Sequence, residues 1–182
     1  MREWIAAAAL IMCAGGEAMA AEQVCGATVH SRFGETRAYF SDVLGACRPD
    51  GYCSAVVALK DDGGAMYRQQ LRVARPSPHA PYQVEFVAVS PMPADDAQPM
   101  TLAFGRRTLS LAGAIGPSAP NSANEYRVTS ETVADDLVNR MKKAREAGWT
   151  YRSVAGPATA RFPLRGMTAA LTWIDCVGAG GK

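Results

Sequence analysis

The chain has 182 residues, of which 48% are hydrophobic, and its 19 basic and 17 acidic side chains give a formal net charge of +2. A chain of this length suits one domain, which can bury roughly 70% of its unfolded surface and so hold a real core. The mild charge excludes the concentrated basic face of a nucleic-acid-binding protein, so we expect no nucleic-acid partner.

The first 20 residues predict a secretory signal peptide. Arg2 gives a short basic start, residues 4–14 form an apolar run, and Ala18–Ala20 supplies small residues at the positions that signal peptidase reads. Cleavage is expected after Ala20, with cleavage after Ala21 as the alternative. The remaining chain is then an exported protein, either periplasmic or secreted.

Two other interpretations of this segment are weaker. A membrane anchor needs roughly 20 apolar residues, and the run in this chain is about half as long. A lipid anchor would use Cys13, but Met12 is too large for the position before an acylated cysteine. We therefore expect that the protein is not an integral membrane protein after signal cleavage.

The mature chain keeps four cysteines: Cys25, Cys47, Cys53 and Cys176. An even number in an exported chain predicts disulfides, for which three pairings are possible. We favour Cys47–Cys53, which flank a turn at residues 49–51, and Cys25–Cys176, which would join the ends of the domain. The five residues between Cys47 and Cys53 do not match zinc-site spacing, so no metal is expected.

Most of the chain is predicted to form strands. Residues 22–38 are weakly patterned and allow one short strand, whereas residues 39–44 and 54–59 form the arms of a hairpin around the Cys47–Cys53 turn. Alternating apolar and polar residues, bounded by Gly- and Pro-rich turns, predict the other strands. These strands are residues 67–73, 82–88, 100–104, 108–111, 126–128, 149–154 and 158–164.

Two segments carry helical spacing instead. Ser130 is a good N-cap for a helix of about residues 131–147, whose apolar stripe precedes Gly148. A short amphipathic helix is predicted for about residues 166–174, and residues 178–182 are expected to form a flexible tail. The fold class is then α+β and β-rich: a single antiparallel β-sandwich or barrel-like domain over residues 21–177.

Motifs that carry known chemistry are missing from the sequence. It has no nucleophile elbow, zinc-protease helix, phosphate loop or dinucleotide fingerprint, so no cofactor is expected. His30 and His79 are its only histidines, and both are interpreted as structural. The acidic pairs Asp61–Asp62, Asp95–Asp96 and Asp135–Asp136 suit turns or a helix start, and they are too few for a calcium site.

Five arginines form a candidate surface for an anionic partner. They lie on or near predicted strands, where a solvated strand face is the alternative interpretation: Arg68, Arg72, Arg75, Arg106 and Arg107. Residues 113–124 form a long loop of small and turn-forming residues, which is either functional or simply mobile.

Two stretches resemble the invasion-associated locus B family. Residues 39–47, with Cys53 following, resemble its opening strand pair, in which an aromatic residue precedes a Cys-turn-Cys pair. Residues 162–175 resemble its closing strand and helix, and also the end of a second exported family of unknown function. Between the two stretches, residues 71–73 before a Pro-rich turn and Ala147-Gly148 fall in the expected order.

The sequence also departs from that family. Val43 stands where a tryptophan is expected, the mid-domain cysteine pair of many members is missing, and Cys25 and Cys176 lie outside the usual pattern. The resemblance implies an exported envelope protein, linked in some pathogens to host-cell colonisation, with no established active site.

The favoured interpretation is a non-catalytic periplasmic or secreted binding module that interacts with an unknown envelope or host protein. Two alternatives remain open. One is an exported hydrolase that uses carboxylates, which would need an acidic pair in a deep pocket. The other is an inhibitor or accessory subunit of an envelope enzyme.

Overall fold

A large antiparallel sheet forms the centre of the molecule. The computed structural model describes residues 22–60, 67–92, 100–120 and 122–181. Eight strands of this sheet lie in the order β11-β12-β8-β7-β6-β5-β4-β3. Their bounds are β3 His30–Arg32, β4 Glu35–Phe40, β5 Val43–Cys47, β6 Cys53–Lys60, β7 Tyr67–Arg75, β8 Gln83–Ala88, β11 Ile115–Pro117 and β12 Glu125–Val128.

The other strands form two smaller antiparallel sheets. A four-stranded sheet has the order β10-β9-β13-β14, and β1 pairs with β2. Their bounds are β1 Gln23–Val24, β2 Ala27–Thr28, β9 Thr101–Phe104, β10 Arg107–Ser110, β13 Glu146–Ser153 and β14 Gly156–Pro163. Each strand order runs from one edge to the other, so no sheet within the described residues closes into a barrel. The β-rich α+β class is confirmed.

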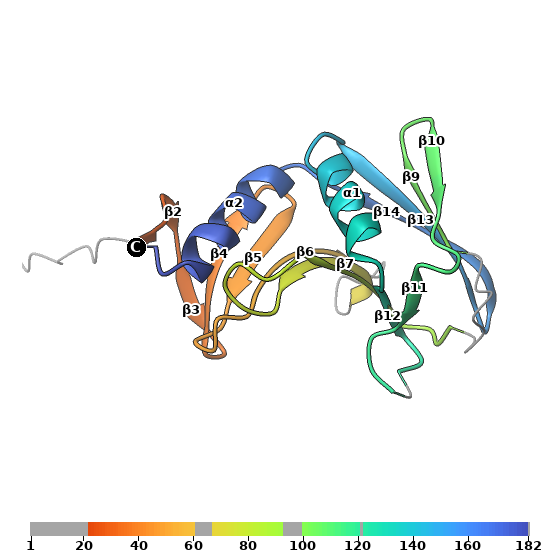
Figure 1. The fold of residues 1–182 in the computed structure, drawn as a ribbon, viewed down its shortest axis with the longest axis horizontal. Coiled ribbons are helices and arrows are strands. Elements are labelled where there is room, and N and C mark those ends of the chain that lie inside the picture. The colour runs from red at the N-terminus through yellow and green to blue at the C-terminus, as the bar shows by residue number, and fades with distance from the viewer. Residues whose placement is uncertain (1–21, 61–66, 93–99, 121, 182) are drawn as a thin grey trace, which may run out of the picture.

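Both helices lie on the same side of the large sheet (Figure 1). Helix α2, Met167–Gly178, contacts β4, β5 and β6, and helix α1, Glu131–Met141, contacts β8 and β12. Strand β14 packs between them against β6 and β7. The result is two layers, and we call the covered side of the large sheet its inner face and the other side its outer face.

The core lies between these layers and is built around aromatic rings. Trp149 on β13 is fully buried and stacks on Tyr151 with ring centroids 3.8 Å apart. Phe86 from the large sheet and Phe162 from β14 lie 5.1 and 6.3 Å from the same indole ring. Large buried aromatic side chains of this kind dominate core energetics.

Helix α1 begins where the sequence predicted and ends earlier. The Ser130 side chain accepts a hydrogen bond from the Val133 backbone N–H, as expected of an N-cap. The helix ends at Met141 instead of about residue 147, and β13 starts at Glu146. Ala147, Trp149 and Tyr151 are buried at every second position, so strand pairing overrides the helical spacing there.

Three other element predictions need correction. Residues 39–44 are not one strand, because Ser41, at φ 53°, lies in a turn between β4 and β5. Residues 22–38 hold β1, β2, β3 and most of β4, because short, mostly exposed strands carry no apolar alternation. Helix α2 extends to Gly178, so this residue belongs to the helix and not to the predicted tail.

The two family-like stretches, residues 39–47 and 162–175, contact each other. Arg165 donates two hydrogen bonds to the Asp42 carboxylate, at 2.7 and 3.0 Å. Gly166 has a φ of +89°, and a Cβ there would lie 1.9 Å from the Phe40 carbonyl oxygen. Glycine is therefore required at residue 166 both for backbone conformation and for space.

Candidate functional site

The outer face of the large sheet carries a hollow of about 860 Å³, which we call the outer trough. Clefts that bind ligands typically enclose roughly 300–1,000 Å³. Strand alternation directs Leu44 of β5, Val56 of β6, and Arg72 of β7 to this face, while their neighbours in sequence face the helices. Glu85 of β8 pairs with Arg72 and extends the same surface.

Small side chains make part of the trough's floor. Ala46 and Ser54 are paired residues of β5 and β6, and Ala58 lies farther along β6. Because these side chains are short, they leave the space above the sheet unfilled, while longer side chains from the neighbouring strands and loops form the sides of the trough.

The charges in the outer trough are mixed and mostly paired. Its lining holds five basic and four acidic side chains, so it presents no strong field of one sign. Arg72 bonds Glu85 at 3.0 Å, and Arg37 bonds Glu35 at 2.5 Å. Such a surface suits a partner that carries both signs of charge.

Tyr52 borders the outer trough from the Cys47–Cys53 turn. Burial raises the pKa of its hydroxyl, and nearby Glu85 raises it further, whereas Arg72 and Arg48 act in the opposite direction. The Arg48 guanidinium lies 4.3 Å from the centre of the Tyr52 ring. The tyrosine therefore stays neutral at physiological pH and can offer its hydroxyl as a hydrogen-bond donor.

Part of the predicted loop at residues 113–124 also reaches the outer trough. Ile115–Pro117 forms β11, and Ser118 and Ala119 line the trough. The Ser118 hydroxyl is buried and has no hydrogen-bond partner among the described residues. An unpaired buried hydroxyl is costly in a native structure and is uncommon there.

An exposed aromatic residue stands at one end of the outer trough. Phe33 is 79% exposed at the tip of the β3–β4 hairpin, and its φ of 55° is rare for a residue other than glycine. The guanidinium groups of Arg32 and Arg37 lie 4.7 and 5.3 Å from the centre of its ring. Both arginines also line the outer trough.

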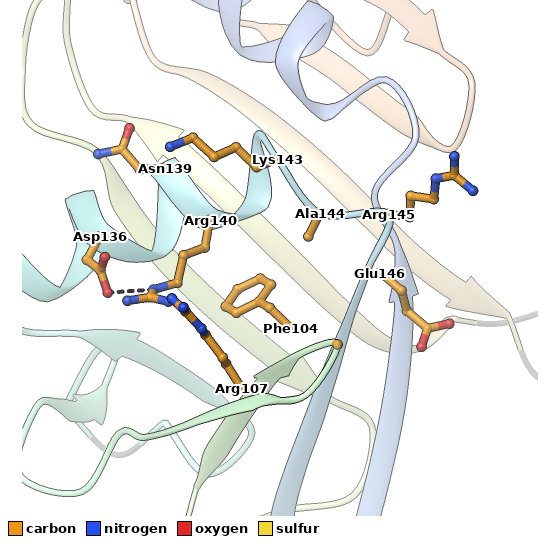
Figure 2. A pocket seen from close by; sticks show the side chains of 10 residues that line it. Phe104, Arg107, Asp136, Asn139, Arg140, Lys143, Ala144, Arg145 and Glu146 are labelled. Carbon is orange, nitrogen blue, oxygen red and sulfur yellow. Dashed lines mark hydrogen bonds and ion pairs between the residues drawn. The ribbon is translucent and has the colours of Figure 1, made fainter.

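The five arginines of the predicted anionic-partner surface lie in three different places. Arg72 lines the outer trough, and Arg68 is exposed four positions earlier on β7. Arg106 and Arg107 belong to the β9–β10 hairpin of the smaller sheet. Arg107 lines a separate pocket beside α1, shown in Figure 2.

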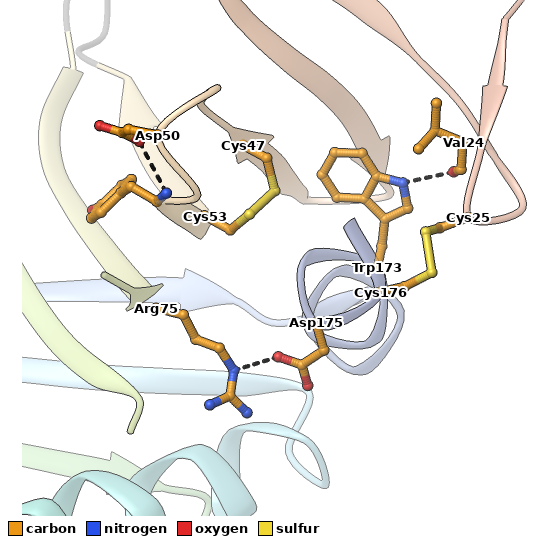
Figure 3. Close-up of a disulfide and its surroundings, with 10 residues drawn as sticks. Val24, Cys25, Cys47, Asp50, Cys53, Arg75, Trp173, Asp175 and Cys176 are labelled. Carbon is orange, nitrogen blue, oxygen red and sulfur yellow. Dashed lines mark hydrogen bonds and ion pairs between the residues drawn. A yellow bond between two sulfur atoms is a disulfide. The ribbon is translucent and has the colours of Figure 1, made fainter. Parts of the chain in front are cut away.

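Arg75 lies on the inner side of β7, opposite in direction to Arg72. It bonds Asp175 of α2 at 2.5 Å (Figure 3). Its guanidinium also lies 3.8 Å from the centre of the Tyr82 ring. The Tyr82 hydroxyl donates to the same carboxylate at 2.6 Å. Strand parity in the sequence already separated residue 75 from residue 72, and this signal could have excluded Arg75 from a common surface with Arg72.

Both predicted disulfides are confirmed (Figure 3). Cys47 and Cys53 are directly opposite residues of β5 and β6, with Cα atoms 4.1 Å apart. Cys25 and Cys176, with Cα atoms 6.1 Å apart, join the β1–β2 turn to α2. Next to this bond, the Trp173 indole N–H donates to the Val24 carbonyl at 2.9 Å.

The residues considered for catalysis do not gather in one place. His79 is an exposed residue of the loop before β8, and His30 lies on the edge strand β3. Asp135 and Asp136 are exposed on α1, where Asp136 bonds Arg140 at 2.8 Å. The pairs at residues 61–62 and 95–96 lie outside the described residues.

The described ranges hold neither a metal-site cluster nor a helix that could cross a membrane. No cluster of three or more histidine, cysteine, aspartate or glutamate side chains there has the arrangement of a metal site. Among the helices of the described ranges, none has both the length and the apolar character to cross a membrane.

Comparison with known proteins identifies a shared fold. No protein-family model matches the sequence, and no curated protein matches it either. The structure is similar to the crystal structure of invasion associated protein B from Bartonella henselae, with a TM-score of 0.58. The match covers 79% of this chain and 98% of that chain at 12% sequence identity. At this identity the likeness shows the fold, which is the part of the predicted resemblance that is confirmed.

Proposed function

We propose that the protein is an exported, non-catalytic binding module of the bacterial envelope, and that its outer trough holds a segment of a partner protein. The trough carries this proposal because it is an open hollow of about 860 Å³ on the sheet face opposite the two described helices, α1 and α2. The shared fold with invasion associated protein B supports an envelope protein of the same general kind.

The chemistry of the outer trough favours a polypeptide as its occupant. Its floor has small and apolar side chains, and its sides carry paired groups of both signs, such as Arg72 and Glu85. A segment with mixed side chains and backbone amides can match such a surface, whereas a polyanion would meet Glu35 and Glu85 as well as the arginines. Neither histidine lies among the residues that line the trough, which fits binding better than acid–base chemistry.

Phe33 provides the hydrophobic anchor of this surface. An exposed aromatic ring flanked by two arginines combines residue types that carry much of the energy of protein interfaces. The strained conformation of Phe33 places its ring in solvent at the end of the outer trough, where a partner can cover it.

Export is supported by the disulfides and by the predicted signal peptide. Disulfides form and persist in oxidising compartments. The signal segment itself lies outside the described residues. The intact mass of protein recovered from periplasm should show loss of residues 1–20 or 1–21, whereas a full-length, membrane-bound species would contradict export.

A capture experiment with matched variants tests the outer trough. Mature protein carrying Val56→Arg, on the trough, is compared with Val154→Arg, in the β13–β14 turn, where the valine is 68% exposed. Both are used to capture partners from periplasmic and outer-membrane extract, and captured proteins are identified by mass spectrometry.

Under this proposal a partner retained by wild type and by Val154→Arg is lost with Val56→Arg, and is also reduced with Phe33→Ser. Circular dichroism must show that each variant keeps its fold. If Val56→Arg is folded and retains the same partners as wild type, the outer trough is not the binding site.

A further inference from the structure

A second hollow, of about 660 Å³, lies between the β9–β10 hairpin and α1, on a part of the molecule built by the smaller sheet. Its walls come from Phe104 and Arg107 on the hairpin and from Asn139, Arg140 and Lys143 in or just after the helix. We call it the cationic pocket. It shares no lining residue with the outer trough, so it is independent of the function proposed above.

Basic side chains from separate elements converge in this pocket. Figure 2 shows the Arg107 side chain reaching from β10 toward the Arg140 guanidinium, with the Phe104 ring beside them. Lys143 extends from the end of α1 toward Asn139 (Figure 2). Arg145 also lines the pocket, but its side chain points away from the other cations in the same view.

The positive charge of the pocket is only partly compensated. Asp136 bonds Arg140 at 2.8 Å, while Arg107 and Lys143 have no acidic partner among the described residues. Arg107 and Arg140 converge on one carboxylate, which leaves one positive charge there, and Lys143 adds a second positive charge at the side of the pocket near Asn139. Glu146 also lines the pocket, but it bonds Arg161 at 3.4 Å, and its carboxylate points away from the two arginines in Figure 2. Like charges held together repel each other, and this repulsion is relieved when an anion binds between them.

The dipole of helix α1 explains only part of this arrangement of basic side chains. Basic residues in the last turn of a helix interact favourably with its negative end, which accounts for cations near Met141. Arg107 comes from a strand of another element, and the Arg140 guanidinium bonds Asp136, one turn back along the helix. The helix dipole therefore does not account for the convergence of Arg107 and Arg140 beside Phe104.

We infer that the cationic pocket binds a phosphomonoester attached to an apolar group. A phosphomonoester carries a charge of about −1.5 to −2 at neutral pH, which matches the two uncompensated positive charges. Planar guanidinium groups bind phosphate oxygens through paired hydrogen bonds. Lys143 and the Asn139 amide add further donors, and the half-buried Phe104 ring packs against the apolar part of the ligand.

Phenyl phosphate serves as the soluble probe, and isothermal titration and NMR chemical-shift mapping measure its binding to the full mature chain. Phenyl sulfate, which carries one charge, and phenol, which carries none, should bind more weakly in that order. Phe104→Ala should weaken phenyl phosphate more than inorganic phosphate, because only the former loses its ring contact.

The chain offers matched controls for each cation. Arg107→Gln should weaken phenyl phosphate about tenfold or more, because a charge-assisted hydrogen bond is lost. Arg106→Gln removes the same charge from the neighbouring residue, which does not line the pocket, and should have little effect. Lys143→Gln and Lys142→Gln form a second pair of the same kind.

Asp136→Asn should strengthen phenyl phosphate binding, whereas the variants of the cations should weaken it. It frees Arg140 and raises the net charge of the pocket, so phenyl phosphate should bind severalfold more tightly. Thermal unfolding of every variant checks that the fold is kept. A merely structural role for Asp136 would not make binding tighter.

Vesicles distinguish the source of the phosphate. Phosphatidylcholine vesicles with and without phosphatidic acid, which carries a phosphomonoester, test a lipid headgroup against a soluble ligand. Binding to phosphatidic acid that Arg107→Gln abolishes and phenyl phosphate competes supports the pocket with a lipid ligand. Equal losses with Arg106→Gln and Arg107→Gln would overturn the inference, as would the absence of binding to both probes.

Discussion

The two helices cover the same face of the large sheet but are held to it by different means. Helix α2 carries a disulfide to the N-terminal strands, an ion pair to β7 and an indole hydrogen bond to Val24. Helix α1 rests on the buried side chains of Ala134, Leu137, Val138 and Met141. Helix α2 also buries apolar side chains, among them Met167, Leu171 and Ile174. The end of the molecule around α2 therefore combines apolar packing with covalent and polar contacts, whereas the end around α1 depends mainly on apolar packing.

Because of this difference, we expect reduction of the disulfides and truncation of core side chains to affect different ends of the molecule. Reducing agents should loosen the α2 end while the α1 end keeps its contacts, since both disulfides involve strands or helices near α2. Truncating core side chains under α1 should act equally in oxidised and reduced protein. The four variants that follow each remove one stabilising contact.

The largest effect is expected from replacing Cys25 and Cys176 together by alanine. Their bond spans 151 residues, and the chain-entropy model assigns such a bond about 5 kcal/mol of stability. Urea unfolding should show this loss, and hydrogen exchange should be fastest in α2. Replacing Cys47 and Cys53 is the control, at about 2.4 kcal/mol for the short loop. An equal or larger loss in the control would contradict the assigned role of the long bond.

Leu137→Ala should be the next largest change. Leu137 lies on α1 and is fully buried, and truncating such a leucine costs about 2–5 kcal/mol. The loss should be the same with and without reducing agent, as measured by denaturant unfolding. A cost below about half a kcal/mol would mean that the helix does not depend on this packing.

The polar contact between α2 and β7 should show in alkaline solution. Burial, together with the Asp175 carboxylate, raises the pKa of Tyr82 to about 12. The neutral hydroxyl therefore stabilises the fold below pH 10, and this contribution is lost as pH rises toward 12. Wild type and Tyr82→Phe should differ in unfolding midpoint at pH 8–9 and converge by pH 12. A constant difference across this range would argue against the raised pKa.

The smallest effect is expected at the exposed contact between Asp42 and Arg165. Hydrogen bonding from Arg165 lowers the pKa of Asp42 below its usual value of 3.8. The ionised carboxylate stabilises the fold above that pH, and the contribution is lost as the solution is made more acidic. Asp42→Asn should unfold slightly earlier than wild type at pH 6, with the gap closing toward pH 2. High salt should reduce the gap as well.

The strands with regular alternation were predictable from the sequence, and the edge strands were not. Leu71 and Val73 alternate with polar residues because β7 is central, with one face against the core. Tyr67, which the sequence placed in the same alternation, is 51% exposed and lines the outer trough, because a bulge shifts the register before Gln69. Strand β3 is exposed at all three positions, so its sequence carries no apolar pattern. The start of α1 was correct because Ser130 caps it locally, and its end was missed because tertiary pairing decides it.

The sites were harder to predict than the elements. The disulfides followed from cysteine number and spacing, which are properties of the chain alone. The outer trough joins residues from Arg32 to Glu125, and it exists only because of the order in which the strands lie in the sheet. The position of Phe33 at the tip of a hairpin was indicated only by the following Gly34, because a Phe-Gly turn lacks the usual Asn or Asp at the first position.

The Cys25–Cys176 bond turns most of the chain into a macrocycle. A protease that cuts once at an exposed position within the ring, such as Ala119 or Pro120, cannot release a fragment, because the two pieces stay joined through sulfur. A second cut or a reductant is needed before anything separates. A circularly permuted chain would have its termini at another place in this ring. With the new termini in the loop at residues 119–120, it should keep the contacts described for the native chain.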